Sequence, residues 1–327
     1  MLSSFSSQSP TSTPDKDLPL MGLGTFIGIE ADRIADHEAR QKVTTDTIYC
    51  ALAEGYRHLD LAENYGNLPA VAAALKKAFL PKSEGGLGLK REEIWLTMKS
   101  DGFTERNVNA LLKVVGVKYF DLFLIHHPQS AGFASENSLK KCWHELASID
   151  KSKVKRIGVS NFYEPHLERL LAICERESLE KPYANEIELN ILCKNKVTVD
   201  YCQKAGIKVI AYSPLGYANV SLLLANEELN ALAKKMGATP AQAALAWMME
   251  KGIAVIPKTT KVERLAENLQ STRFIDSVKS HHHERAAIDA QDDVVSDGLS
   301  QTAVDAKEHA ERIDWDPTAK KNTQGFG

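Results

Sequence analysis

Short apolar segments alternate with amphipathic helical patterns along most of the chain, from about Leu18 to Leu269. The apolar segments predict strands, and the amphipathic segments between them predict helices. The expected strands are 22–26, 58–61, 94–98, 120–125, 156–159, 184–187, 208–212 and 253–256. The expected helices are 41–54, 68–79, 105–115, 139–149, 165–176, 197–205, 227–235, 240–250 and 262–269. Eight strand–helix units favour an α/β fold that closes as a (β/α)8 TIM barrel of parallel strands.

The sequence also weighs against the main rival architecture, a doubly wound open sheet. A dinucleotide-binding fold of that kind needs a G-x-G-x-x-G turn between its first strand and helix. The sequence has no such turn there, because GLGTF at 22–26 is too short and no helix follows it directly. One barrel over residues 18–279 is therefore expected to make up most of the 327-residue chain.

Two polar segments flank the expected barrel. Residues 1–17 are rich in Ser, Thr and Pro, which is typical of a flexible tail. Residues 280–327 are polar and charged, could form a helix over 300–312, and either lie over a barrel mouth or are disordered. The His run at 281–283 suits a metal site or a solvated loop, and we favour the loop.

Composition bears on partners and compartment. The formal net charge of −3 offers no basic field for nucleic acid or an anionic membrane. No apolar run approaches the roughly 20 residues of a membrane span. Five cysteines without metal-type spacing favour free thiols in a reducing cytoplasm. We therefore expect a cytoplasmic monomer that acts on a small molecule and holds no metal.

Polar residues follow the expected strands at their carboxyl ends, which is where α/β barrels carry their active sites. They are Asp60, Lys99, His126, Ser160, Asn161, Glu186, Tyr212, Ser213 and Lys258. Tyr65 follows Asp60 by one helical turn or a short loop. Taken alone, each of these residues is better explained as a solvated residue at the rim of the barrel or as a packing residue. Only their occurrence together favours a catalytic role.

Four of these residues make a coherent proton-donor system. A Tyr hydroxyl has an ordinary pKa of about 10 and is a weak acid at neutral pH. A nearby Lys ammonium would lower that pKa, and an Asp would hold the Lys in place. A His beside the Tyr can orient a carbonyl oxygen or help to pass the proton. Asp60, Tyr65, Lys99 and His126 thus point to carbonyl reduction, with a hydride arriving from a cofactor.

The chain resembles the aldo-keto reductase superfamily from about residue 21 to residue 269. The matching stretches are MGLGTF (21–26), GYRHLDLAENYGN (55–67), LTMKS (96–100), FDLFLIHHP (120–128), GVSNF (158–162), AYSPLG (211–216) and IPKTTKVERLAENL (256–269). The resemblance implies that Tyr65 is the general acid, tuned by Lys99 and Asp60 and assisted by His126. It implies that Phe26 and His127 face the substrate, although many relatives carry Trp where this chain has His127.

The resemblance also implies NADPH bound in an extended form without a Rossmann turn, which agrees with the missing glycine fingerprint. The implied contacts are Gly24, Thr25, Ser160, Asn161, Glu186, Tyr212, Ser213, Leu215, Lys258, Thr259, Arg264, Glu267 and Asn268. Among them, Tyr212 would stack on the nicotinamide ring, and Ser160 and Asn161 would bond its carboxamide. Lys258 and Arg264 would grip the 2′-phosphate, a pairing that also suits a dianion on physical grounds.

One residue departs from the family pattern, because Glu186 stands where relatives usually have Gln. An ionised carboxylate only accepts hydrogen bonds, so it can bond the carboxamide NH2 but not its oxygen. Its negative charge would also favour the oxidised, cationic nicotinamide. Protonation, or pairing with a nearby cation, would relieve this conflict. A second departure, ELNIL at 188–192, replaces a His-Pro turn and is expected to affect structure only.

Two other functions stay open at this point. A catalytically weak NADPH-binding barrel, regulatory or structural, is compatible with Glu186, although the intact set around Tyr65 opposes it. A different barrel enzyme, such as a metal-dependent hydrolase or an aldolase with Lys99 as Schiff base, is less favoured. A hydrolase needs His and carboxylate ligands on several strands, and an aldolase Lys needs a dry pocket rather than a partner such as Asp60.

Replacing Glu186 with Gln is expected to tighten NADPH binding, because an amide can both donate to and accept from the carboxamide. Titration of the wild-type and E186Q proteins with NADPH, followed by nucleotide fluorescence, measures the two dissociation constants. An unchanged or weaker affinity in E186Q would contradict this expectation.

Overall fold

Eight parallel strands lie in sequence order in one sheet in the computed structural model, which describes residues 17–26, 36–131 and 136–293. Each strand pairs in parallel with the next one along the chain. The strands are β1 (Leu23–Gly24), β2 (His58–Ala62), β3 (Trp95–Ser100), β4 (Phe120–Ile125), β5 (Val154–Ser160), β6 (Ala184–Glu188), β7 (Lys208–Tyr212) and β8 (Ala254–Val255). The predicted helix over 300–312 and nearly all of the predicted N-terminal tail lie outside the described residues.

Hydrogen bonds also join the two ends of this sheet. Met21 forms a parallel bridge with Val255 of β8. The Gly22 amide donates to the Val255 carbonyl at 2.9 Å, and the Val255 amide donates to the Leu20 carbonyl at 2.7 Å. The first and last strands are therefore connected, and the curled sheet of eight parallel strands is consistent with the predicted (β/α)8 architecture.

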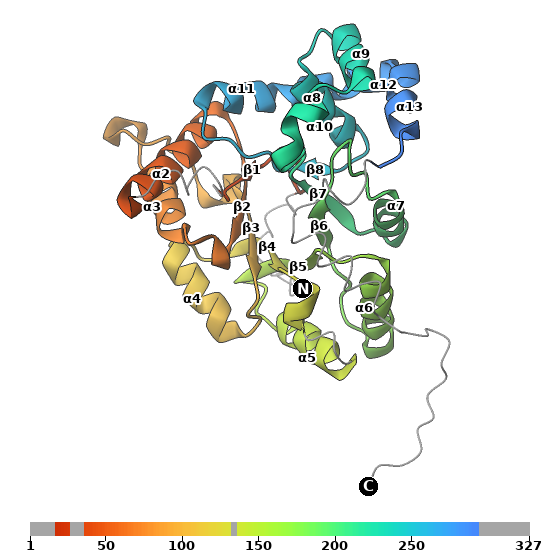
Figure 1. Ribbon diagram of the computed structural model, residues 1–327. Coiled ribbons are helices and arrows are strands. Elements are labelled where there is room, and N and C mark those ends of the chain that lie inside the picture. The colour runs from red at the N-terminus through yellow and green to blue at the C-terminus, as the bar shows by residue number, and fades with distance from the viewer. Residues whose placement is uncertain (1–16, 27–35, 132–135, 294–327) are drawn as a thin grey trace, which may run out of the picture.

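Helices surround the outside of the strands (Figure 1). They are α2 (His37–Glu54), α3 (Leu68–Phe79), α4 (Glu105–Val115), α5 (Glu136–Ala147), α6 (Glu164–Glu177), α7 (Lys196–Ala205), α8 (Val220–Leu224), α9 (Glu227–Met236), α10 (Pro240–Glu250), α11 (Val262–Gln270), α12 (Ile275–Ser280) and α13 (His282–Ala290). Local sequence sets their ends. The Thr239 side chain and Gln242 form a capping box at the start of α10, and Gly55 ends α2 at φ 113°.

β3 and β4 are buried on both faces along their whole length. In β4, Leu122 and Leu124 pack in one cluster with residues of other strands, while Phe123 and Ile125 pack in the larger cluster that includes the helices. Successive side chains of a strand point to opposite faces. In β3, Trp95, Thr97 and Lys99 therefore share one face, with Lys99 at the carboxyl end, while Leu96 and Met98 lie on the other. The strand period thus directs Lys99 into the interior of the curled sheet.

The structure corrects several sequence predictions. The first strand is limited to two residues of the predicted 22–26, and α8, α12 and α13 were not predicted. The His run does not lie in a loop, because His282 and His283 begin α13, although both are exposed. α8 is only five residues long, and α12 and α13 contain few large apolar residues. Their packing depends on single contacts such as Ile288, which is fully buried.

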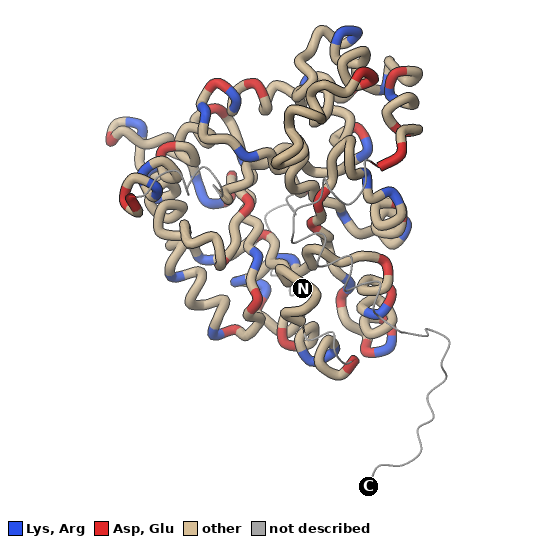
Figure 2. Tube along the Cα trace, in the orientation of Figure 1, with Lys and Arg blue, Asp and Glu red and all other residues tan. Residues whose placement is uncertain are grey.

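The outer helices carry both signs of charge, and Figure 2 shows Lys and Arg interspersed with Asp and Glu along them. Ion pairs such as Arg176–Glu136, between α6 and α5, contribute up to about 1 kcal/mol each. Among the described helices, none has the length and apolar character needed to cross a membrane.

Candidate active site

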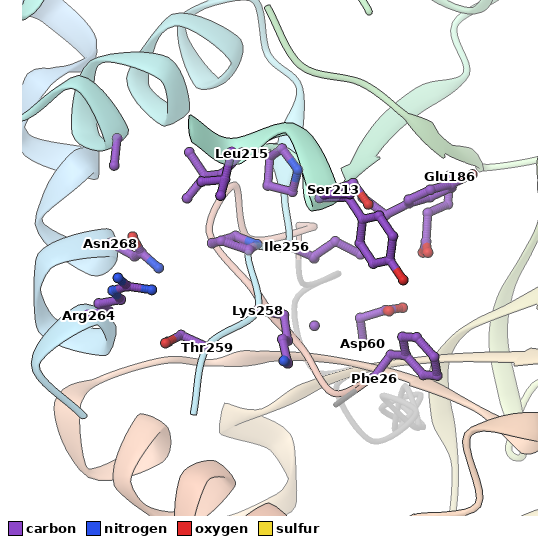
Figure 3. A pocket seen from close by; sticks show the side chains of 18 of the residues that line it. Phe26, Asp60, Glu186, Ser213, Leu215, Ile256, Lys258, Thr259, Arg264 and Asn268 are labelled. Atoms are coloured by element: carbon purple, nitrogen blue, oxygen red, sulfur yellow. The ribbon is translucent and has the colours of Figure 1, made fainter. Parts of the chain in front are cut away.

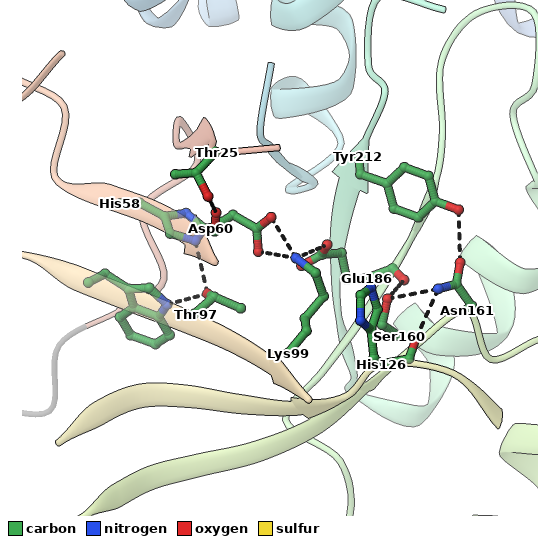
Figure 4. A network of polar contacts seen from close by, with 11 residues as sticks. Thr25, His58, Asp60, Thr97, Lys99, His126, Ser160, Asn161, Glu186 and Tyr212 are labelled. Carbon is green, nitrogen blue, oxygen red and sulfur yellow. Dashed lines mark hydrogen bonds and ion pairs between the residues drawn. The ribbon is translucent and has the colours of Figure 1, made fainter. Parts of the chain in front are cut away.

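Three strands bring an ammonium group and two carboxylates together at the carboxyl end of the sheet. Lys99 Nζ of β3 lies 2.5 and 2.6 Å from the two carboxylate oxygens of Asp60 on β2. It lies 2.8 Å from Glu186 Oε1 on β6. Figure 4 shows Lys99 between these two carboxylates. The three residues are at most 2% exposed, so their charges are compensated by each other and not by water.

The contact between Lys99 and Glu186 crosses the interior of the sheet. Their strands, β3 and β6, are separated by β4 and β5. Neighbouring strands lie ~4.8 Å apart, so in a flat sheet β3 and β6 would be roughly 14 Å apart. A distance of 2.8 Å between Lys99 and Glu186 therefore depends on the curvature of the sheet.

Tyr65 stands beside Lys99 on a short 3-10 helix, η1 (Glu63–Tyr65), which directly follows β2. Gly66, at φ 66°, ends this helix. The Tyr65 ring packs between Phe26 and His126, with ring centroids 5.0 and 6.1 Å away. Lys99 Nζ lies 5.3 Å from the Tyr65 centroid. The structure thus gathers the four residues of the predicted proton-donor system.

The pKa of the Tyr65 hydroxyl differs from the sequence expectation. Burial raises this pKa, Lys99 lowers it through its charge and a hydrogen bond, and the charges of Asp60 and Glu186 raise it. The net direction is upward. Lys99 lowers the pKa of Tyr65 as predicted, but the prediction left out the opposing charges of Asp60 and Glu186. Any group that removes negative charge from this cluster would make Tyr65 a better acid.

His126 is a neutral imidazole in this setting. Burial lowers its pKa to about 3, and the charge of Lys99 acts in the same direction. Its Nδ1 atom has no hydrogen-bond partner among the described residues. A neutral His126 can orient a carbonyl oxygen by hydrogen bonding, but it carries no imidazolium proton to donate at neutral pH.

His127 stacks on His126 with ring centroids 4.1 Å apart, and its Nδ1 lies 3.3 Å from Asp101 Oδ1. The ligand atoms of these three residues lie within 4.8 Å of one another, as a metal site would require. However, the two rings are stacked and inclined by only 21°, so the in-plane lone pairs of their nitrogens lie in nearly parallel planes and do not readily converge on one ion. This geometry suits hydrogen bonding better than coordination, and the absence of a metal stays a prediction.

A second polar network lies next to Glu186 (Figure 4). Ser160 Oγ and the Asn161 amide both donate to the Glu186 carbonyl at 2.9 Å. Asn161 accepts a hydrogen bond from the Tyr212 hydroxyl at 2.8 Å and donates to the His126 carbonyl at 3.0 Å. Asn161 adopts φ 63°, a left-handed conformation that Asn tolerates better than most residues. These bonds set the orientation of Asn161 and Tyr212 beside the proton-donor group.

A cavity of about 1330 Å³ extends from this polar centre to the start of α11. Figure 3 shows Asp60, Glu186 and Phe26 at one end, Thr259, Arg264 and Asn268 at the other, and Lys258 between them. Of the residues predicted from the sequence, the cavity is lined by Gly24, Phe26, Asp60, Tyr65, Lys99, His126, His127, Ser160, Asn161, Glu186, Tyr212, Ser213, Leu215, Lys258, Thr259, Arg264, Glu267 and Asn268.

Thr25 is the exception among the predicted residues. It does not line the cavity, and its hydroxyl instead donates to the Asp60 carbonyl at 2.7 Å. The Thr25 carbonyl accepts a hydrogen bond from Asn67 at 2.7 Å. Thr25 therefore supports the backbone at Asp60, and its predicted direct contact with a cofactor is not supported by this position.

The sequence analysis missed one wall of the cavity, formed by the segment after β7 and the start of α10. It comprises Pro214, Tyr217, Ala218, Val220, Ser221, Leu224, Thr239, Pro240 and Ala241. These residues are not at strand ends, so the rule used to find the site could not select them. Thr239 is connected to a predicted residue, because its hydroxyl donates to Glu267 at 2.7 Å.

Glu186 holds its proton more tightly than an ordinary carboxyl group. Burial and the charge of Asp60 together raise its pKa to about 8, against the opposing effect of Lys99. The folded pKa lies above the ordinary value of 4.5, so between these values unfolding releases a proton. The contribution of Glu186 to stability is thus full below about pH 4.5 and is lost as pH rises towards 8.

The E186Q protein is therefore expected to gain stability relative to wild type as pH rises from 5 to 8, by up to about 1.4 kcal/mol per pH unit. Urea denaturation at several pH values measures the free energy of unfolding of both proteins. Glu188→Gln is the matched control, because Glu188 is a buried carboxylate on the same strand. A constant difference between E186Q and wild type over this range would contradict the assignment.

The comparisons with known proteins agree with this geometry. The profile of the Aldo/keto reductase family matches residues 20–289. The chain is 36% identical over 261 residues to a D/L-glyceraldehyde reductase of Hypocrea jecorina, covering 70% of this chain and 76% of that protein. It is 33% identical over 264 residues to a 9,11-endoperoxide prostaglandin H2 reductase of Trypanosoma cruzi, covering 79% of this chain and 83% of that protein.

Solved structures show the same relationship. An aldo-keto reductase of the silkworm Bombyx mori, complexed with NADPH, superposes with a TM-score of 0.71 at 26% identity, covering 88% of both chains. The family profile spans nearly the whole described body, and the relatives are similar over most of their own lengths. The chain therefore belongs to the aldo/keto reductase family of oxidoreductases.

Proposed function

We propose that this protein reduces aldehydes or ketones to alcohols with NADPH, using Tyr65 as the general acid. The observation that carries the proposal is the position of Tyr65. Its ring lies between Phe26 and the neutral His126, beside the Lys99 ammonium, at one end of a cavity large enough for a dinucleotide. The D/L-glyceraldehyde reductase among the relatives supports carbonyl reduction as the reaction class.

The residues along the cavity fit an extended nicotinamide dinucleotide. The basic end, with Lys258 and Arg264, offers two cations for a phosphate near the start of α11. The opposite end carries Glu186, whose buried Oε2 has no hydrogen-bond partner among the described residues and can meet a carboxamide. Tyr212 and Leu215 line the space between these ends, where the nicotinamide ring and the sugar-phosphate chain of the cofactor would lie.

In the proposed reaction the bound cofactor supplies a hydride to the carbonyl carbon. Tyr65 donates its hydroxyl proton to the carbonyl oxygen, and His126 orients that oxygen. Lys99 stabilises the phenolate that Tyr65 becomes, because its ammonium is held beside the ring by Asp60.

Tyr65→Phe is expected to abolish carbonyl reduction while leaving NADPH binding within about threefold of wild type, because only the proton donor is lost. The decrease in absorbance of reduced nicotinamide, with a reactive aromatic aldehyde, measures the activity. Tyr217→Phe is a matched control, since Tyr217 also lines the cavity but stands away from Lys99 in the segment after β7.

Two outcomes would overturn the assignment. Residual activity in Tyr65→Phe close to wild type would exclude Tyr65 as the acid. A wild-type protein that binds NADPH but leaves it unoxidised with all carbonyls tested would favour the catalytically weak, NADPH-binding alternative.

Arg264→Met is expected to weaken NADPH binding about tenfold or more and to leave NADH binding little changed, because only NADPH carries the 2′-phosphate. Arg264 is exposed, so its replacement should not disturb the fold. Dissociation constants for both nucleotides measure the effect. Equal losses for NADPH and NADH would contradict the proposed phosphate site.

A further inference from the structure

The buried polar centre contains more acidic than basic groups. Lys99 supplies one positive charge, whereas Asp60 and Glu186 can supply two negative charges, and all three are at most 2% exposed. Burying a net charge away from water is costly, and one bound proton removes it. The centre is therefore neutral when one carboxyl group is protonated.

The geometry decides which carboxyl group holds that proton. Asp60 contacts Lys99 Nζ with both oxygens, at 2.5 and 2.6 Å. Glu186 contacts it with Oε1 alone, at 2.8 Å, and its Oε2 has no hydrogen-bond partner among the described residues. The ammonium therefore compensates the charge of Asp60 better, and the proton belongs on Glu186.

The surroundings of Glu186 offer no further compensating charge. The titratable groups that face it are Asp60 from β2, Lys99 from β3 and Tyr65 from η1. Its partners in register on the neighbouring strands are Ser160 of β5 and Ile210 of β7, which are uncharged. His126 lines the same cavity, and its low pKa keeps it neutral.

We propose that Glu186 is a proton store whose occupancy follows the redox state of the bound nicotinamide. It holds its proton while the ring is reduced and uncharged, and it releases the proton when the ring is oxidised and cationic. The proposal rests on the proposed function, because it takes the nicotinamide ring to lie beside Glu186 in the cavity.

The released proton has a use in the same reaction. The carbonyl carbon takes the hydride, the C=O π bond breaks, and the oxygen takes the Tyr65 proton. The Tyr65 phenolate then takes a proton from the Lys99 ammonium, and the Lys99 amine takes the carboxyl proton of Glu186. The centre ends with one more negative charge, on Glu186, and the oxidised ring carries one more positive charge. No net charge is created in the buried site, and solvent reprotonates Glu186 once the cofactor leaves.

Thermodynamic linkage gives this proposal a measurable form. If oxidised and reduced cofactor prefer opposite protonation states of Glu186, pH must change the ratio of their affinities. An attraction between the ionised Glu186 and a cationic ring a few Å away is expected to change that ratio about tenfold or more. In this proposal Lys99 and Asp60 keep their charges, so they change the affinity ratio only by a factor that does not depend on pH.

The first experiment measures proton release. NADP+ and NADPH are each titrated into weakly buffered wild-type protein near pH 8 with an indicator dye. Wild type is expected to release more protons on binding NADP+ than on binding NADPH. Proton exchange by the 2′-phosphate occurs with both nucleotides and cancels in the difference. In E186Q the difference is expected to vanish.

The second experiment measures the ratio of the NADP+ and NADPH dissociation constants from pH 6 to pH 9. In wild type the ratio is expected to fall with rising pH, with a slope of up to about one logarithmic unit per pH unit. E186Q is expected to show a flat ratio, and Glu188→Gln, with a buried carboxyl altered on the same strand, to keep the wild-type slope. Thermal melts confirm that each variant is folded.

The outcomes separate this proposal from the proposed function. Folded wild type that binds neither nucleotide would overturn the proposed function itself. Tight NADPH binding and carbonyl reduction with equal proton release for both nucleotides would overturn only the proton store. A slope that persists in E186Q would assign the proton to another group and also reject the proposal.

Discussion

The buried contact of Lys99 with two carboxylates is the interaction on which the polar centre of this protein depends. An ammonium group in the interior of a sheet is tolerated only when its charge is matched nearby. Asp60 provides that match from the neighbouring strand, and Glu186 adds a second contact from across the interior. The acidity of Tyr65 depends on this arrangement, because its ring lies beside the buried Lys99 ammonium.

The same arrangement explains how the roles divide. Burial and the Lys99 charge keep His126 neutral, which is why our proposal assigns the proton donation to the phenol of Tyr65 rather than to the imidazole. A second carboxylate makes that phenol a weaker acid, and this cost is removed when Glu186 holds a proton. A site in which Glu replaces the usual Gln can therefore carry out the same chemistry, provided that its proton is supplied and removed at the right time.

Reading polar residues at strand ends found the polar centre of the cavity, because parallel strands in a barrel direct their carboxyl ends to one face. Asp60, Lys99 and Glu186 were all selected in this way. The rule failed where the cavity wall is built from other elements, as at Tyr217 and Pro240, because a loop or a helix start carries no strand signal. Thr25 was suggested by the family resemblance instead, and its hydroxyl donates to the Asp60 carbonyl.

The sequence by itself determined the alternation of strands and helices, the face on which Lys99 lies, and the presence of a Tyr, Lys, Asp and His at the right ends. These follow from local periodicity and from the chemistry of side chains. Only the tertiary structure decided that Glu186 meets Lys99. The contact joins β6 to β3, which are not neighbouring strands, and it exists because the sheet curls. The charge balance of the site, and with it the acidity of Tyr65, is set by that contact across the interior, which no pattern along the chain encodes.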